Sequence, residues 1–328
     1  MTKNVLRIKN VSKSFVDENH KVSLLPWKSK KMFRAISGIT LDVKQGETYG
    51  VLGHNGCGKS TLIRMIATLL IPDKGEIRVF GKDVYKSRAA VKKLINRVSV
   101  EASFFKRLSA RENLIYAARL YGMDVADAEK KAKAILKQIG FPMKKYDEPV
   151  EKYSRGLQQK VAITRGFLTT PRLLLLDEPT TGLDPKSKKE VQMFIRSIRK
   201  KHDVTLMLSS HDMDEVDALC DRIAIMNSGR IVAEGTGEEL KKLVQENDKY
   251  EIVTSQLKDV YLALKDVEGV LDIKVADKKV VFESKKKILP KVVQKLNGLD
   301  FEQINTVKPT LEDVFLHLTG KSLSDQEE

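Results

Sequence analysis

A glycine-rich segment, GHNGCGKS at residues 53–60, contains the residue types and spacing that bind a phosphate chain. It fits the pattern G-x-x-x-x-G-K-[ST], whose glycines let backbone N–H groups surround phosphate oxygens. In that pattern Lys59 neutralises the terminal phosphates and the hydroxyl of Ser60 holds Mg²⁺. The apolar run YGVL before the segment and TLIRMIATLL after it predict a strand, the loop and a helix from Lys59 to about Leu70. The predicted nucleotide-binding residues here are Gly53, His54, Asn55, Gly56, Cys57, Gly58, Lys59, Ser60 and Thr61.

Cys57 lies within this segment, at the predicted helix start and beside Lys59. A helix N-terminus and a neighbouring ammonium group both favour a thiolate. The sequence therefore predicts a reactive cysteine that bound ATP protects from thiol reagents. The alternative is a small residue that merely fits the loop.

Two acids end the apolar run RLLLLDEP at residues 172–179, which predicts a buried strand. Ligands of α/β sheets bind at the carboxyl ends of the strands, so Asp177 is a candidate Mg²⁺ ligand and Glu178 a candidate base for an attacking water. An acidic helix cap before Pro179 is the alternative. The next apolar run, VTLMLSSH, ends in His211, which we expect to contact the terminal phosphate or to position the water.

The elements that position these residues follow an α/β order with a different texture at the C-terminal end. A strand is predicted at 5–15, two strands at 36–53 around a Gln45–Gly46 turn, and a hairpin at 222–235 around Ser228–Gly229. The other predicted elements are a strand at 76–81, a mostly helical stretch at 86–170 and a polar helix at 185–201. After a linker at 236–248, the order β-α-β-β-α-β and a last helix at 311–320 predict a small ferredoxin-like domain.

Composition limits the class of protein. The length of 328 residues predicts about two domains, and the hydrophobic fraction of 41% is sufficient for packed cores. There is no run of about 18 apolar residues, no apolar N-terminal signal and no cysteine framework, which predicts a soluble cytosolic protein. The net charge of +15 is compatible with nucleic acid, an anionic surface or a polyphosphate. Residues 241–328 contain 15 lysines against 16 acids, so the excess lies in residues 1–240.

Two further motifs complete an ordered set. The sequence YSRGLQQK at 153–160 resembles the signature of the ABC transporter superfamily, and TTGLDP at 180–185 resembles its D-loop, with Asp184 as the acid. Phosphate loop, signature, Asp-Glu strand, D-loop and switch histidine occur in family order. The chain therefore resembles an ATP-binding subunit of an ABC transporter. The basic insert before FRAISGITLDVKQGE, the degenerate signature and the ending PTLEDVFLHLTGKSL are similar to the ABC-2-type export branch, the drug-resistance and sodium-export ATPases.

This resemblance implies an α/β P-loop ABC ATPase fold in residues 1–240, with a helical subdomain at about 100–170 and an accessory domain at 241–328. It implies ATP and Mg²⁺ as cofactors and catalysis by Glu178 and His211. Two ATPase subunits, alike or related, would pair head to tail, so that Ser154, Arg155 and Gly156 contact ATP in trans. The implied partner is an ABC-2-type membrane permease, which would hold the chain at the inner face of the cell membrane, and no specific nucleic acid is expected.

Two positions depart from the family pattern. A glutamine that touches Mg²⁺ usually follows the first strands, and here Val100 stands at that position, followed by Glu101 as the candidate metal ligand. The usual adenine-stacking aromatic is Phe15, for which a core role is the alternative. The basic insert 17–34 is predicted to lie near a membrane interface or the nucleotide, or else to be a solvated loop. Phe104 and Phe105 would form a docking patch if exposed and core if buried.

Two other functions compete with ATP-driven export. The first is a soluble ABC-type ATPase that acts on nucleic acid or the ribosome, which the charge allows. Such relatives usually have two cassettes or long coiled-coil inserts, and the sequence contains neither. The second is a regulatory nucleotide-binding protein, which applies only if Glu178 is not catalytic.

Overall fold

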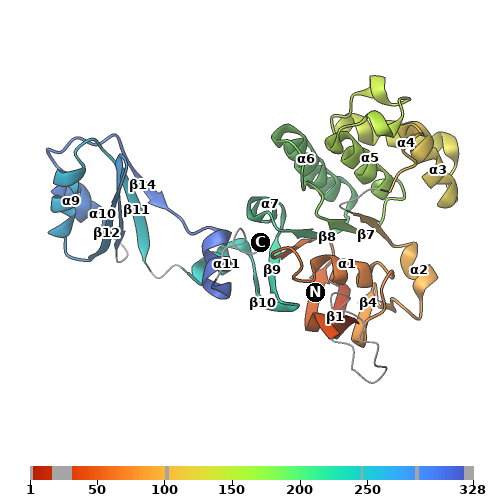
Figure 1. Cartoon of the computed structure of the whole chain (residues 1–328), viewed down its shortest axis with the longest axis horizontal. Helices are drawn as coiled ribbons and strands as arrows, with labels where there is room; N and C mark the ends of the chain where they lie inside the picture. Colours follow the sequence, from red (N-terminus) through yellow and green to blue (C-terminus); the bar gives the residue numbers. More distant parts are fainter. Residues whose placement is uncertain (1–2, 17–31, 100–102, 245–246, 285–287, 321–328) are drawn as a thin grey trace, which may run out of the picture. The chain divides into compact units, whose positions relative to one another are not determined.

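The computed structural model describes residues 3–16, 32–99, 103–244, 247–284 and 288–320 (Figure 1). Val100, Glu101 and most of the insert 17–34, including Trp27, lie outside these residues. The chain divides into two compact units, one that extends to Gly237 and one at 238–320. Within the described ranges, no helix combines the length and the hydropathy of a membrane span.

A six-stranded sheet forms the centre of the first unit. Its order is β10-β9-β3-β8-β7-β6, and all neighbouring strands are parallel except the β9–β10 hairpin. The strands are β3 (Thr48–Leu52), β6 (Ile95–Val98), β7 (Leu173–Asp177), β8 (Thr205–Ser210), β9 (Arg222–Asn227) and β10 (Arg230–Gly235). Every residue of β3, β7 and β8 is buried, as is typical of parallel strands covered on both faces. The carboxyl ends of these three strands lie at one edge.

A second, antiparallel sheet in this unit has the order β2-β1-β4-β5. Its strands are β1 (Asn4–Val16), β2 (Met32–Lys44), β4 (Lys74–Val79) and β5 (Lys82–Asp83). The two strands predicted at 36–53 are both present, but β2 and β3 belong to different sheets. One apolar core, which includes Ile8, Leu41, Ile63 and Met207, joins the two sheets to the helix after the phosphate loop.

The remaining elements of this unit are helices and 3₁₀ turns. They are α1 (Lys59–Ile66), α2 (Arg88–Lys92), α3 (Ala110–Leu120), α4 (Val125–Gln138), α5 (Arg155–Phe167), α6 (Pro185–His202) and α7 (Met213–Leu219), with 3₁₀ turns η1 (Met143–Lys145) and η2 (Val150–Lys152). In Figure 1, α3, α4 and α5 form the yellow-to-green helical group. The structure differs from the prediction in three places: α1 ends at Ile66 and not at about Leu70, the mostly helical stretch contains the strand β6, and α7 was not predicted. Thr68, with φ of 64°, explains the early end of α1.

The second unit has the predicted ferredoxin-like order. After α8 (Gly237–Lys242), its elements are β11 (Asp248–Val253), α9 (Leu257–Lys265), β12 (Val270–Ala276), β13 (Lys279–Ser284), α10 (Leu289–Lys295), β14 (Gln303–Val307) and α11 (Leu311–Thr319). The antiparallel sheet has the order β12-β13-β11-β14, so β11 and β12 are separated by β13. Its core includes Ile252, Leu264, Phe282 and Val292.

Candidate functional site

The phosphate loop connects β3 to α1 at the carboxyl edge of the six-stranded sheet. Two of its glycines have no room for a side chain. A Cβ at Gly53 would lie 2.3 Å from the carbonyl oxygen of Met226. A Cβ at Gly58, where φ is 110°, would lie 2.4 Å from that of Ala35. The close packing fixes the loop and leaves the first N–H groups of α1 available to an anion.

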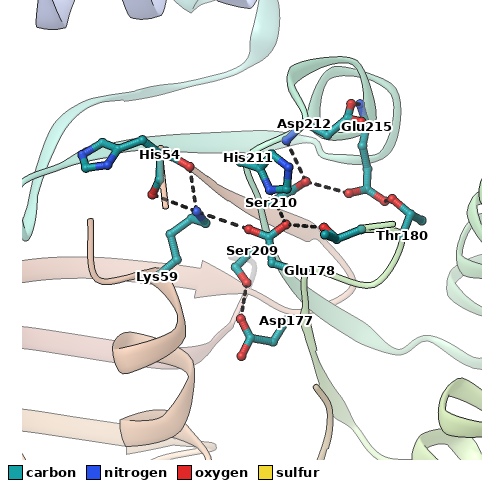
Figure 2. A network of polar contacts seen from close by, with 12 residues as sticks. His54, Lys59, Asp177, Glu178, Thr180, Ser209, Ser210, His211, Asp212 and Glu215 are labelled. Atoms are coloured by element: carbon teal, nitrogen blue, oxygen red, sulfur yellow. Dashed lines mark hydrogen bonds and ion pairs between the residues drawn. The ribbon is translucent and has the colours of Figure 1, made fainter. Parts of the chain in front are cut away.

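Lys59 is the buried cation of the loop, with 5% of the side chain exposed. Its Nζ donates hydrogen bonds to the carbonyl oxygens of Gly53 (2.7 Å) and His54 (3.1 Å). The same nitrogen lies 3.2 Å from Oε1 of Glu178 (Figure 2). An entering phosphate therefore finds a cation that is already oriented by the loop and shared with an acid.

Asp177 ends β7 and is almost completely buried, with 1% exposed. Its Oδ1 accepts hydrogen bonds from the hydroxyls of Ser60 (2.9 Å) and Ser209 (2.7 Å). Its Oδ2 pairs with Nη2 of Arg97 on β6 at 2.9 Å. A serine hydroxyl beside a carboxylate is a pair of hard oxygen ligands of the kind that Mg²⁺ prefers. Arg97 and Ser209 were not predicted from the sequence.

Glu178 follows Asp177 in a left-handed conformation, with φ of 52°, which is unusual for a non-glycine residue. Its Oε2 accepts a hydrogen bond from the hydroxyl of Thr181 and lies 2.7 Å from Nδ1 of His211. Its buried Oε1 accepts no hydrogen bond from the described residues. Burial by itself raises the pKa of Glu178, but the contact with His211, the charge of Lys59 and the Thr181 hydroxyl outweigh it, and the pKa is lowered. The acid is therefore ionised, and its Oε1 is paired with Lys59 but accepts no hydrogen bond from the described residues.

A cleft of about 520 Å³ lies over these groups. Its lining residues are Phe15, Phe33, Ala35, Asn55, Gly56, Gly58, Lys59, Ser60, Thr61, Glu178, Thr181 and His211. Phe33 was missed by the sequence analysis. It lies directly opposite Phe15 in the β1–β2 register, and both rings are partly exposed, at 55% and 38%. The pair offers two flat apolar faces near the phosphate loop, of the kind on which a nucleotide base stacks.

Two other residues predicted to bind nucleotide, His54 and Cys57, have side chains that support the structure of the loop. The ring of His54 contacts the carbonyl oxygen of Asn55 and the side chain of Asn227, so only its backbone faces Lys59. Cys57 is buried, with 1% exposed. Burial raises the pKa of the Cys57 thiol, and the charge of Lys59 only partly opposes this. The predicted thiolate is therefore wrong, because tertiary packing outweighs the helix terminus and the neighbouring cation.

The signature residues lie apart from the cleft of their own chain. Ser154 is the exposed N-cap of α5, and Arg155 beside it is also exposed. A Cβ at Gly156 would lie 2.8 Å from Oγ of Ser187, and one at Gly182 would lie 2.8 Å from Nη1 of Arg155. The start of α5 and the D-loop therefore form one surface. Asp184 belongs to it as the N-cap of α6, where hydrogen bonds from Ser187 lower its pKa.

The chain matches two known families, and the second match begins close to the start of the second structural unit. Residues 36–181 match the ABC transporter family, and residues 235–319 match the C-terminal domain of ATP-binding proteins like DrrA1-3. The first match includes the phosphate loop, the signature segment and the two acids at the end of β7. The second includes all four strands of the ferredoxin-like unit.

Individual relatives extend over nearly the whole chain. The linearmycin resistance ATP-binding protein LnrL of Bacillus subtilis is 32% identical over 88% of this chain and 95% of its own length. The bacitracin transport ATP-binding protein BcrA of Bacillus licheniformis is 34% identical over 88% and 93%. Among solved structures, the ADP conformation of MJ1267, an ATP-binding cassette of an ABC transporter, superposes with a TM-score of 0.60 at 26% identity, over 74% of this chain and 95% of that one.

Proposed function

Because the chain belongs to the family of ABC transporter ATP-binding proteins, we propose that it is the ATP-hydrolysing motor of an export system whose membrane permease is a separate chain. Several relatives are named for resistance to antibiotics or for their transport, which supports export of such a compound. No relative described above is named for an action on nucleic acid. The ABC-2 class of the permease remains part of this proposal.

One observation carries the chemical part of the proposal: Glu178 is held between Lys59, which pairs with its Oε1, and His211, which contacts its Oε2. When the terminal phosphates attract Lys59, the ion pair to Oε1 is weakened. That oxygen can then accept a proton from a water, while His211 keeps Oε2 in place. We propose that Glu178 orients and activates the attacking water and that His211 positions Glu178. Lys59 and the α1 N–H groups hold the phosphates.

We propose that Ser60 and Asp177 hold Mg²⁺ beside the phosphates. Their oxygens lie 2.9 Å apart, and Ser209 orients the carboxylate from the other side. The ion, when bound, neutralises charge on the phosphate oxygens. Arg97 pairs with Oδ2 of Asp177, so part of the negative charge of the carboxylate is balanced before the ion binds.

We propose that the ATP-bound form is a head-to-tail dimer. Ser154 and Arg155 are exposed at the N-terminus of a 13-residue helix, where N–H groups favour an anion, yet neither lines the cleft. A second subunit would bring this surface onto the first subunit's cleft. The partner is either another copy of the chain or a related ATPase subunit.

We propose that the permease docks on an aromatic patch defined by Phe105, Tyr116, Leu120 and Tyr121. These side chains are 44–69% exposed, and the rings of Phe105 and Tyr116 meet edge to face with centroids 5.0 Å apart. The exposed Lys106 and Arg107 border the patch. Phe104 is different, since it is half-buried against the guanidinium of Arg165. An exposed apolar patch of this kind marks a protein contact, and docking there would hold the chain at the membrane.

The proposal is tested by co-expressing the chain with candidate polytopic membrane proteins, beginning with any that a neighbouring gene encodes. We expect the two to co-purify and ATPase activity to rise with the partner in lipid vesicles. Phe105→Ser should abolish co-purification while the isolated chain keeps its basal ATPase activity. Lys144→Ala, an exposed change elsewhere, should leave both co-purification and basal activity unchanged. Retained co-purification of Phe105→Ser would contradict the docking surface. Failure of any membrane protein to stimulate turnover would contradict the motor role.

A further inference from the structure

Glu215 is a buried acid that does not line the cleft. It lies in the first turn of α7, and 1% of it is exposed. One carboxylate oxygen accepts a hydrogen bond from the hydroxyl of Thr180 (2.6 Å), and the other accepts one from the hydroxyl of Ser210 (2.7 Å). Figure 2 shows Glu215 with these neighbours at one end of the polar network. The carboxylate therefore joins two segments that are distant in the sequence.

These two segments contain the groups that the proposed mechanism uses. Thr180 stands two positions after Glu178, and Ser210 immediately precedes His211. The contact between Glu178 and His211 is one link between the segments. The bonds of Glu215 form a second link behind it, away from the cleft. Thr180 also begins the D-loop, residues 180–185, which lies beside the signature surface.

Helix capping does not account for the buried carboxylate. Asp212 is already the N-cap of α7 and accepts the backbone N–H of Glu215 at 2.9 Å. A first-turn acid can interact with the helix dipole from the surface, so that interaction does not require the burial. Burial instead raises the pKa of Glu215, and the two hydroxyls only partly offset this. Burial therefore disfavours the charged form of the side chain, and the two hydrogen bonds support it.

We propose that Glu215 is a positioning residue for ATP hydrolysis. It holds Thr180 and Ser210 at a fixed separation, and so sets the orientation of His211 against Glu178. A shift of the D-loop is passed through the same carboxylate to His211. This inference rests on the roles proposed above for Glu178 and His211.

The test compares Glu215→Ala and Glu215→Gln with the wild-type full chain in kcat, KM for ATP and the Kd of a non-hydrolysable ATP analogue. For Glu215→Ala we expect kcat to fall about 10-fold or more, because small misplacements of reacting groups are costly. KM and Kd should stay within about threefold, since Thr180 and Ser210 do not line the cleft. Glu215→Gln should recover most of kcat. The amide oxygen accepts a hydrogen bond from one hydroxyl and the amide NH₂ donates one to the other, whose hydrogen can rotate away.

Val216→Ala is the matched control. Val216 is the next residue of α7 and is fully buried, so its truncation lowers stability without touching the link. Wild-type kcat in folded Glu215→Ala, or an equal loss of kcat in Val216→Ala at a matched melting temperature, would overturn the positioning role. If Glu215→Ala does not fold, Ser210→Ala, which removes one donor and keeps the acid, is measured with the same criteria.

Glu178→Gln separates this inference from the proposed function. Turnover that survives Glu178→Gln would mean that the proposed function fails. Loss of turnover in Glu178→Gln, together with wild-type kcat in Glu215→Ala, would remove only the positioning role.

Discussion

The ammonium nitrogen of Lys59 lies 3.2 Å from Oε1 of Glu178, and both side chains are more than nine-tenths buried. The cation required by the phosphates therefore neutralises the acid proposed to activate water. Because the two residues lie on the phosphate loop and at the end of β7, phosphate binding at one is felt directly at the other. In the proposed mechanism, nucleotide binding therefore frees the oxygen of Glu178 that activates the water.

Lys59→Ala should weaken nucleotide binding itself. A hydrogen bond to a charged group contributes about 1.5–3 kcal/mol, so the Kd for ATP should rise about 10- to 150-fold. Calorimetry with the ATP analogue measures this, and Lys144→Ala, an exposed lysine of η1, is the control. An unchanged affinity in Lys59→Ala would rule out the role assigned to this cation.

Gly58→Ala should destabilise the fold more than a glycine substitution made in open space. Gly122 also has a positive φ, of 67°, but an added Cβ there meets nothing within 4 Å. Gly122→Ala should therefore cost only the conformational term, about 1–2 kcal/mol. Gly58→Ala should add the clash with the Ala35 carbonyl to that term. Urea unfolding of the two variants checks this, and equal losses would show that the loop is not held as described.

Arg97→Gln should reduce the Mg²⁺ requirement. Arg97 places a positive charge 2.9 Å from Asp177, next to the proposed ion site. Glutamine keeps a hydrogen-bond donor for Oδ2 and removes the positive charge, which repels the ion strongly at short range. The Mg²⁺ concentration at half-saturation should therefore fall by about threefold or more. The readout is binding of a fluorescent ATP analogue during a Mg²⁺ titration. A higher requirement in the variant would mean that Arg97 assists the ion.

Glu215→Gln should change how stability depends on pH. Burial raises the pKa of Glu215, with Asp212 adding to the effect and the charge of Lys188 opposing it. The folded state thus binds this proton more tightly, so this carboxyl stabilises the fold at low pH. That contribution is lost as pH rises from the ordinary glutamate value, about 4.3, through the raised one.

The glutamine variant has no such proton to lose. The melting temperature of the variant minus that of wild type should therefore increase as pH rises through that window. Asp214→Asn, on the exposed side of the same helix, is the control. A difference between variant and wild type that does not change with pH would contradict the raised pKa of Glu215.

Sequence reasoning succeeded where the information is local. The phosphate loop, the acids after LLLL and the Ser228–Gly229 turn are each defined by a few adjacent residues, and the structure places them at strand ends or turns. It failed where tertiary packing decides. The segment INRV of β6 has two polar residues and becomes a strand by pairing with β7. The helix α7 has only seven residues, too few for a clear apolar period.

The unpredicted site residues follow the same rule. Arg97 meets Asp177 only because β6 and β7 are neighbours in the sheet, and nothing in its local sequence indicates this. Phe33 reaches the cleft through the long β1–β2 pairing. The serines before His211 were the one available signal, because small hydroxyl residues in an otherwise apolar buried strand require partners.

The central claim is that Glu178 activates the water that hydrolyses ATP. The direct measurement is ATP turnover of Glu178→Gln, combined with size-exclusion chromatography in ATP and Mg²⁺. Glutamine has a similar shape but cannot accept the proton of the attacking water. We predict intact ATP binding, no detectable turnover and a stable ATP-bound dimer. Turnover at the wild-type rate would contradict the account.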